Sequence, residues 1–277
     1  MHSGLLSPSR LAPLLLDATE GGERAAVFVV VSHPDPEQIG GRLLFHGESE
    51  AGALPDPSAQ EAARKLAKRG LGGDVTVLPG LHTLTLEGGG EMVVYLELHH
   101  PSPELVIVGA GHVAQPLCTL GALLGLRVRV LDDRPRFATR ERFPEAFDLR
   151  NVDFSDPFAG LPLHSWSHVV LVTRGHRYDY ECLRKVLMLP VLPGYIGMIG
   201  SRRRVRATFE ALMNEGIGSE VLREIHTPIG LDIGAETPAE IAVSVAAEVV
   251  HRWRGGSCRP MREAEGILDR FFREEDT

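Results

Sequence analysis

Cysteine is scarce in this chain: the 277 residues contain three, Cys118, Cys182 and Cys258. They lie far apart, are odd in number and form no C-x-x-C pair, so the sequence has neither a disulfide framework nor the ligand spacing of a zinc site. This usage suits a reducing compartment. We expect a cytoplasmic protein and assign no metal ligands.

Long apolar runs and excess positive charge are also missing. No uninterrupted stretch approaches the roughly 18 residues that a membrane span requires, and Pro8, Arg10 and Pro13 break the N-terminal leucine clusters, which lack the layout of a signal peptide. Subtracting 37 acidic from 29 basic residues leaves a formal charge of −8. We therefore expect no membrane and no nucleic-acid partner, and any anion site must be a local basic cluster.

The length suffices for about two domains. Residues 1–100 predict a smaller, β-rich α+β domain with one clear helix. Strands are expected at Ala25–Val31, Arg42–His46 and Asp74–Leu78, a helix at Ser58–Arg69, and a hairpin of His82–Glu87 and Glu91–Leu98. The proline-rich stretch at 101–103 marks the boundary to the next domain.

Strand and helix patterns alternate over residues 104–254. Strands are expected at Glu104–Val108, Arg127–Leu131, Ala146–Leu149, Val169–Val172 and Tyr195–Ile199, with helices at His112–Leu124, Tyr178–Leu189 and Arg202–Glu215. Such alternation predicts a Rossmann-like, doubly wound parallel sheet covered by helices on both faces. A last helix begins with a capping box at Thr237–Glu240.

The tail, residues 255–277, contains an amphipathic helical stripe made of Ile267, Leu268, Phe271 and Phe272. The stripe can dock on the chain's own body, or on a second copy in a homodimer.

A glycine turn follows the first strand of the second domain. Gly109 permits the turn, Gly111 lets the backbone approach a phosphate, and the small Ala114 lets helix and strand pack closely. Backbone amides at the helix start, around Ala110, His112 and Val113, would face the anion. Asp132 ends the next strand, 21 residues after Gly111, where a carboxylate can accept hydrogen bonds from ribose hydroxyls. Alternatively, Asp132 or its neighbour Asp133 caps the loop or pairs with Arg134 and Arg136.

Three further segments can contribute to a site. Thr173, Gly175, His176 and Asp179 follow a central strand, at the sheet edge where ligands of doubly wound folds bind. His176 and Asp179 are three residues apart at a helix start, so both can face one site as a ligand pair, an acid–base couple or a cap. They are the candidate catalytic groups.

Gly200, Ser201 and Arg202 open the next helix, where arginines beside free amides can trap a phosphate or carboxylate, or else remain solvated. Gly230 and Asp232 belong to a loop, 228–236, that we expect to lie over the site. Asp232 is an acid–base or metal candidate, or it satisfies backbone amides.

The second domain resembles the xanthine dehydrogenase accessory protein (XdhC/CoxI) family over about residues 104–254. The resemblance rests on several motifs in family order: Gly109–Ala114, Leu131–Arg134, Glu141–Ala146, Tyr195–Arg202, Pro228–Gly234 and Thr237–Ala242. It implies a chaperone that binds the molybdenum cofactor, as molybdopterin or its dinucleotide form. The implied partners are a cysteine desulfurase-type sulfurtransferase and an apo molybdenum hydroxylase of the xanthine dehydrogenase type.

Two departures from the family pattern concern residues that carry chemistry. Arg174 stands where the family usually has a histidine, although His176 and Asp179 match. The first 100 residues contain no cysteine, and the family's Gly-Gly-Cys-x-Glu run is missing, so this chain cannot handle sulfur through a thiol there. The alternatives to a chaperone are an NAD(P)-dependent oxidoreductase with His176 as proton donor and a nucleotide-sensing protein.

Overall fold

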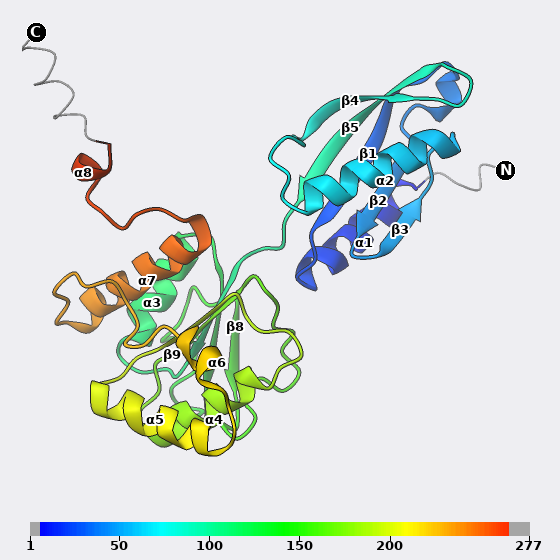
Figure 1. Ribbon diagram of the computed structural model, residues 1–277. Coiled ribbons are helices and arrows are strands. Elements are labelled where there is room, and N and C mark those ends of the chain that lie inside the picture. The colour runs from blue at the N-terminus through cyan, green and yellow to red at the C-terminus, as the bar shows by residue number, and fades with distance from the viewer. Residues whose placement is uncertain (1–5, 266–277) are drawn as a thin grey trace, which may run out of the picture. The chain divides into compact units, whose positions relative to one another are not determined.

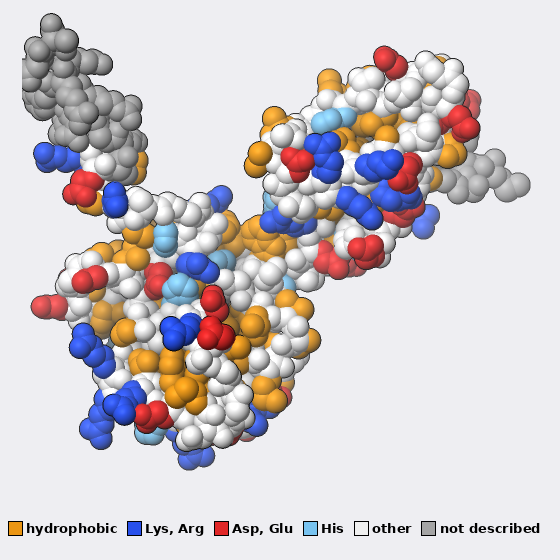
Figure 2. All heavy atoms as spheres, viewed as in Figure 1, with side chains coloured by type: hydrophobic (Ala, Val, Ile, Leu, Met, Phe, Trp, Pro, Cys, Tyr) orange, Lys and Arg blue, Asp and Glu red, His pale blue; other side chains and the backbone are white. Residues whose placement is uncertain are grey.

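The computed structural model describes residues 6–265, and these divide into two compact units at the boundary between Ser102 and Pro103 (Figure 1). Acidic and basic side chains are interspersed on the face of each unit that Figure 2 shows. Among the described residues, no helix is both long enough and apolar enough to span a membrane.

The N-terminal unit is built on a five-stranded antiparallel sheet with the strand order β3-β2-β1-β5-β4. The strands are β1 (Ala25–Ser32), β2 (Arg42–His46), β3 (Ser49–Gly52), β4 (Gly80–Thr85) and β5 (Glu91–His99). One sheet face packs on α2 (Pro57–Leu71) through buried side chains such as Phe28, Leu43 and Ala63. The other packs on α1 (Pro8–Glu20) around Val27 and Leu44. A short 3-10 turn, η1, covers Pro36–Gln38.

Three features of this unit differ from the sequence prediction. The strand expected at Asp74–Leu78 is wrong: the segment forms turns, because the Asp74 carboxylate accepts hydrogen bonds from the amide and the hydroxyl of Thr76 at 2.9 and 2.6 Å. The short edge strand β3 was missed. Helix α1 was also missed, because its prolines read as breaks, whereas Pro8 occupies the first helical turn, where no amide donor is needed.

The C-terminal unit confirms the Rossmann-like prediction. Its five parallel strands have the order β10-β9-β6-β7-β8. They are β6 (Glu104–Val108), β7 (Arg127–Asp132), β8 (Asp148–Asn151), β9 (Ser167–Leu171) and β10 (Tyr195–Met198). Every residue of β6 and β9 is buried, as expected for central strands covered on both faces.

Helices cover both faces of this sheet. Alternate side chains of β6 explain this: Leu105 and Ile107 join a core with α3 (Ala114–Leu123) and α7 (Pro238–Arg254), whereas Val106 and Val108 join a second core with α4 (His176–Leu187) and α5 (Arg202–Asn214). The remaining helices are α6 (Ser219–Arg223) and α8 (Met261–Glu265). Figure 1 shows α3 beside α7 and α4 beside α5.

The capping box predicted for the last helix is present at the start of α7. The Thr237 hydroxyl accepts a hydrogen bond from the Glu240 amide at 3.3 Å, and the Glu240 carboxylate accepts one from the Thr237 amide at 2.9 Å. The predicted amphipathic stripe at Ile267, Leu268, Phe271 and Phe272 lies outside the described residues.

Candidate functional site

A cavity of about 780 Å³ lies where the central parallel strands end. Its wall consists of residues 111–113 after β6, Arg134, Phe137 and Arg142 after β7, residues 172–174 after β9, Gly200, Ser201 and Arg204 after β10, and Ile199, Pro228 and Pro238. This is the carboxyl edge of a doubly wound sheet, the place where such folds bind ligands. Most segments selected from the sequence meet there.

The two glycines of the turn after β6 have different reasons to be glycine. Gly109 has φ +107°, and a Cβ on it would lie 2.6 Å from the carbonyl oxygen of Val172, so the fold itself requires glycine. A Cβ on Gly111 would meet no protein atom within 4 Å. Packing within residues 6–265 therefore does not explain Gly111, which leaves open space on the cavity side.

The backbone amides after this turn have no partner in the described part of the chain. The Ala110 amide donates to Asp132, but the amides of Gly111, His112 and Val113 form no hydrogen bond with the described residues. These three residues line the cavity and lead into α3. Free amides at a helix start are a suitable environment for an anion.

Asp132 lies beneath the cavity wall, fully buried, and pairs with Arg134. One carboxylate oxygen accepts hydrogen bonds from the Arg134 amide and Nε at 2.9 and 2.8 Å, and the other from Arg134 Nη2 and the Ala110 amide at 2.9 and 2.7 Å. Burial acts to raise the pKa of Asp132, but these hydrogen bonds outweigh it and hold the pKa below its ordinary value. The alternative pairing foreseen from the sequence is thus present, and a ligand contact by Asp132 would require Arg134 to move.

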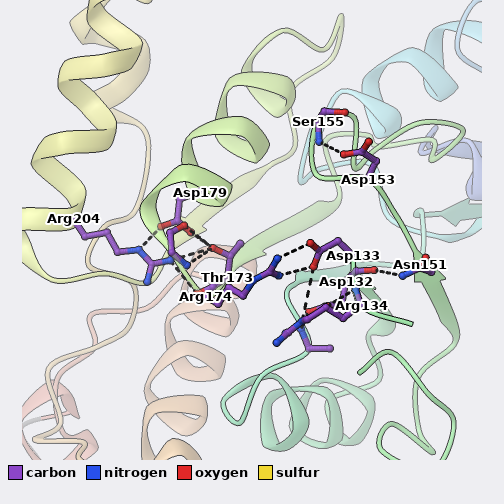
Figure 3. A network of polar contacts seen from close by, with 12 residues as sticks. Asp132, Asp133, Arg134, Asn151, Asp153, Ser155, Thr173, Arg174, Asp179 and Arg204 are labelled. Atoms are coloured by element: carbon purple, nitrogen blue, oxygen red, sulfur yellow. Dashed lines mark hydrogen bonds and ion pairs between the residues drawn. The ribbon is translucent and has the colours of Figure 1, made fainter. Parts of the chain in front are cut away.

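Two further arginines of the cavity wall are held by carboxylates (Figure 3). Arg174 donates to both oxygens of Asp133 at 2.5 and 2.6 Å and lies 3.9 Å from the ring of Tyr178. Arg204 forms a short ion pair with the fully buried Asp179 and donates to the carbonyl and hydroxyl oxygens of Thr173 at 3.0 and 3.1 Å. Asp179 also accepts a hydrogen bond from the Thr173 hydroxyl at 2.6 Å.

His176 and Asp179 do not meet at one site, although both lie in the first turn of α4. His176 is exposed and is not part of the cavity wall, whereas Asp179 is buried and faces Arg204. Gly175 is the N-cap residue of α4 and hydrogen-bonds the Thr173 hydroxyl. The acid–base couple remains a prediction that this geometry does not favour.

At the start of α5, the N-cap Ser201 accepts a hydrogen bond from the Arg204 amide at 3.4 Å. Gly200 and Ser201 line the cavity, but Arg202 is exposed and outside its wall. Arg204, two positions further on, lines the cavity instead. The sequence run of three arginines did not reveal which of them faces the sheet.

The loop at 228–236 reaches the cavity through Pro228 only. Gly230, at φ +109°, packs against Ser244 of α7, and its amide donates to Glu248. Asp232 is exposed and outside the cavity wall. The expected roles of Gly230 and Asp232 in ligand binding therefore stay predictions.

Arg142 lines the cavity, and the sequence reasoning did not assign it a role. Its Nη2 donates to the Ala110 carbonyl at 3.0 Å and to the Gln115 amide oxygen at 3.4 Å, and its guanidinium lies 4.6 Å from the centre of the Phe137 ring. Among the side chains that the structure describes, no carboxylate lies within ion-pair distance of Arg142. Of the four arginines in the wall, Arg142 alone keeps an uncompensated charge in the described part of the chain.

None of the three cysteines belongs to the cavity wall. Cys118 and Cys182 are buried, and burial raises the pKa of the Cys118 thiol to about 11 and that of Cys182 further still. Both thiols are thus protonated and unreactive near neutral pH. Cys258 is exposed and follows α7. In the described range, no three His, Cys, Asp or Glu side chains form a group able to hold a metal ion.

Comparisons with known proteins agree with this architecture. An uncharacterised Escherichia coli protein, YqeB, is 34% identical over 163 residues, which are 58% of this chain and 29% of YqeB. A Bacillus subtilis protein named as a probable subunit of xanthine dehydrogenase is 30% identical over 157 residues, 57% of this chain and 45% of the relative. The matched regions thus span less than half the length of either relative.

A crystal structure described as a xanthine dehydrogenase from Bacillus halodurans shares the fold, with a TM-score of 0.62 at 22% identity over 94% of this chain and 70% of the other. The family description that matches this chain is the XdhC Rossmann domain, over residues 105–249, a range that contains every residue of the cavity wall. The chain therefore belongs to the XdhC family.

Proposed function

We propose that the cavity binds the phosphate-bearing pterin of the molybdenum cofactor and that the chain delivers this cofactor to an apo molybdenum hydroxylase of the xanthine dehydrogenase type. The observation that carries the proposal is the anion environment at the cavity wall: three free amides after β6 and the uncompensated guanidinium of Arg142. The name of the Bacillus subtilis relative and membership in the XdhC family support the choice of client.

The cavity suits a phosphate for physical reasons. Amides at the start of α3 carry partial positive charge, and the helix dipole adds to it. The Arg142 guanidinium adds a positive charge. Its Nη2 is engaged by Ala110 and Gln115 and its Nη1 also donates to the Phe137 carbonyl at 3.4 Å, so the Nε hydrogen and one Nη1 hydrogen remain to donate to a phosphate oxygen. The open space next to Gly111 allows the phosphate to approach the backbone directly. A cavity of about 780 Å³ also has the volume of a typical small-molecule site.

The proposed role is binding and shielding rather than sulfur chemistry by the chain itself. A sulfur relay needs an accessible thiolate, but Cys118 and Cys182 are buried with raised pKa values, and neither lines the cavity. In this proposal the sulfur comes from a cysteine desulfurase-type partner, and the chain protects the cofactor meanwhile.

An NAD(P)-dependent oxidoreductase would use the same glycine turn but needs a proton donor beside the nicotinamide. His176 is the candidate for that role, and it is exposed and outside the cavity wall. Arg134 follows the acidic end of the second strand, where an arginine can accommodate the 2′-phosphate of NADP, but Asp132 engages its guanidinium in this structure.

The proposal is tested by titrating the full chain with molybdopterin and following protein or pterin fluorescence. We expect saturable binding that weakens in Arg142→Ala, with Arg203→Ala as the matched control because Arg203 is exposed and outside the wall. Absence of molybdopterin binding by the folded wild-type protein would refute the proposal.

Delivery is tested by adding the loaded chain to an apo xanthine dehydrogenase with an excess of a competing molybdopterin-binding protein. Activation that persists despite the competitor indicates direct transfer. Activation that the competitor abolishes indicates release into solution and argues against delivery.

A further inference from the structure

The Asp132 carboxylate has no capacity left for a ligand. A carboxylate offers about four lone-pair positions on its two oxygens. Four donors already occupy them: the amide, Nε and Nη2 of Arg134 and the amide of Ala110, all between 2.7 and 2.9 Å. In a dinucleotide-binding Rossmann domain, the carboxylate at the end of the second strand accepts hydrogen bonds from the ribose hydroxyls. Here Arg134 takes those positions.

We infer that Arg134 is a specificity-determining residue: by saturating Asp132, it prevents the cavity from holding the ribose of a nucleotide and leaves it selective for a phosphate monoester without a sugar. The inference concerns the cavity of the proposed function and rests on it for the location of the ligand. It adds the residue that selects among phosphate-bearing ligands.

Packing holds Arg134 in its blocking position. Its guanidinium lies 3.6 Å from the centre of the Phe137 ring, and both side chains belong to the cavity wall. The pair with Asp132 is formed on the buried side, because the Asp132 side chain is 1% exposed and that of Arg134 31%. A ribose would have to displace a stacked, doubly hydrogen-bonded guanidinium to reach the carboxylate.

The neighbouring carboxylate, Asp133, cannot replace Asp132 as an acceptor for ribose hydroxyls. Asp133 binds both terminal nitrogens of Arg174, which in turn packs on Tyr178. After these pairings, the charge that remains in the wall is that of Arg142. The wall thus offers a strong site for one anionic group and no free carboxylate for sugar hydroxyls.

The first experiment compares three probes on the wild-type chain: hydroxymethylpterin phosphate, phenyl phosphate and NADH. Calorimetry or fluorescence gives each dissociation constant at one fixed ionic strength. We expect at least one of the two monoesters to bind about tenfold or more tightly than NADH. Equal or tighter binding of NADH, or no binding of any probe, would overturn the inference.

The same comparison separates this inference from the proposed function. If phenyl phosphate binds better than NADH but the pterin phosphate does not bind, the selectivity for monoesters stands and the pterin proposal fails. If both monoesters bind and NADH is at least as tight, the anion site of the proposed function stands and the role of Arg134 fails.

The second experiment removes the Arg134 side chain that occupies the Asp132 carboxylate. Arg134→Ala should improve NADH binding by about tenfold or more, because sugar hydroxyls can then donate to an ionised carboxylate, whereas phenyl phosphate, which has no hydroxyl to donate, should bind severalfold more weakly beside the uncovered negative charge. Arg136→Ala is the matched control, since Arg136 is exposed two positions away. An unchanged affinity for NADH in folded Arg134→Ala would contradict the inference.

Arg134→Ala also leaves a buried carboxylate with fewer partners, so a more conservative variant is needed. Arg134→Gln keeps an aliphatic contact with Phe137 and one donor for Asp132, and it should show part of the gain in NADH affinity. A merely structural role for Arg134 would lower the affinity for all probes together and would not reverse their order.

Discussion

Arg174 and Asp133 form an ion pair with two hydrogen bonds, 2.5 and 2.6 Å long, between the carboxyl ends of β9 and β7. These strands flank β6 in the sheet, so the pair spans the end of the strand that leads into the glycine turn. The arginine at position 174 neutralises a carboxylate beside the proposed anion site.

Arg174→Ala should affect binding more than stability. Both side chains of the pair are partly exposed, so its loss is expected to change the free energy of unfolding by about 1 kcal/mol or less. Asp133 would keep only its longer, 3.9 Å contact with Arg134 and would repel an anion, so we expect severalfold weaker binding of phenyl phosphate, most clearly at low salt. Titrations at two ionic strengths check this; a salt-independent loss of affinity would speak against repulsion.

Arg204→Ala should be strongly destabilising, because it leaves the fully buried Asp179 without its cationic partner. Breaking a buried pair in this way typically costs about 3–5 kcal/mol. Urea unfolding of the variant measures the cost. Arg203→Ala removes the same charge from an exposed neighbouring position and should stay within about 0.5 kcal/mol of wild type. Equal stability of the two variants would rule out a structural role for Arg204.

Gly111→Ala should separate binding from folding. Its new Cβ meets no protein atom within 4 Å, so stability should change by less than about 1 kcal/mol, whereas phosphate can no longer approach the backbone closely. We expect at least tenfold weaker binding of phenyl phosphate. Gly121→Ala is the opposite case, since its Cβ would lie 2.8 Å from Leu105 and Val128, and it should destabilise the domain. Normal affinity in Gly111→Ala would exclude phosphate from that position.

The variants Arg142→Ala and Arg202→Ala test which of the two arginines binds the anion. Loss of a charge-assisted hydrogen-bond donor costs about 1.5–3 kcal/mol, or roughly 10- to 100-fold in affinity. We expect this loss for Arg142, which lines the cavity, and little change for the exposed Arg202. The sequence analysis assigned anion binding to Arg202. A larger loss of phenyl phosphate affinity in Arg202→Ala than in Arg142→Ala would therefore support that assignment.

His168 should make the C-terminal unit sensitive to mild acid. Burial lowers the pKa of His168 below its ordinary value of 6.5, and its Nδ1 donates to the Glu104 carbonyl at 3.1 Å. A histidine whose folded-state pKa is depressed contributes stability that is present above pH 6.5 and is lost as the pH falls below it. The loss can reach about 1.4 kcal/mol per pH unit.

Denaturant unfolding of wild type and His168→Gln between pH 5 and pH 8 measures this effect, a range chosen around the ordinary histidine pKa of about 6.5. The wild-type curve should fall more steeply on the acid side than that of the variant. Parallel curves would show that His168 titrates alike in the folded and unfolded chain.

Local patterns were enough to predict the Rossmann domain. Alternating strands and helices, the glycine turn at Gly109 and the capping box at Thr237 depend on neighbours within a few residues, so a single sequence reveals them. Interruptions by proline were misleading for α1, because a helix that packs on a sheet tolerates a proline that an isolated helix would not.

The sequence by itself determined the fold class, the carboxyl edge where the site lies and the turn that faces it. Tertiary structure alone decided which charges remain free there. Arg142 reaches the Ala110 carbonyl across 32 residues, Arg174 reaches Asp133 across 41, and Arg204 reaches Asp179 across 25. Such pairings depend on how strand ends are brought together in the sheet. For this reason a list of candidate residues could not distinguish Arg142, whose charge no described carboxylate neutralises, from the arginines that aspartates neutralise.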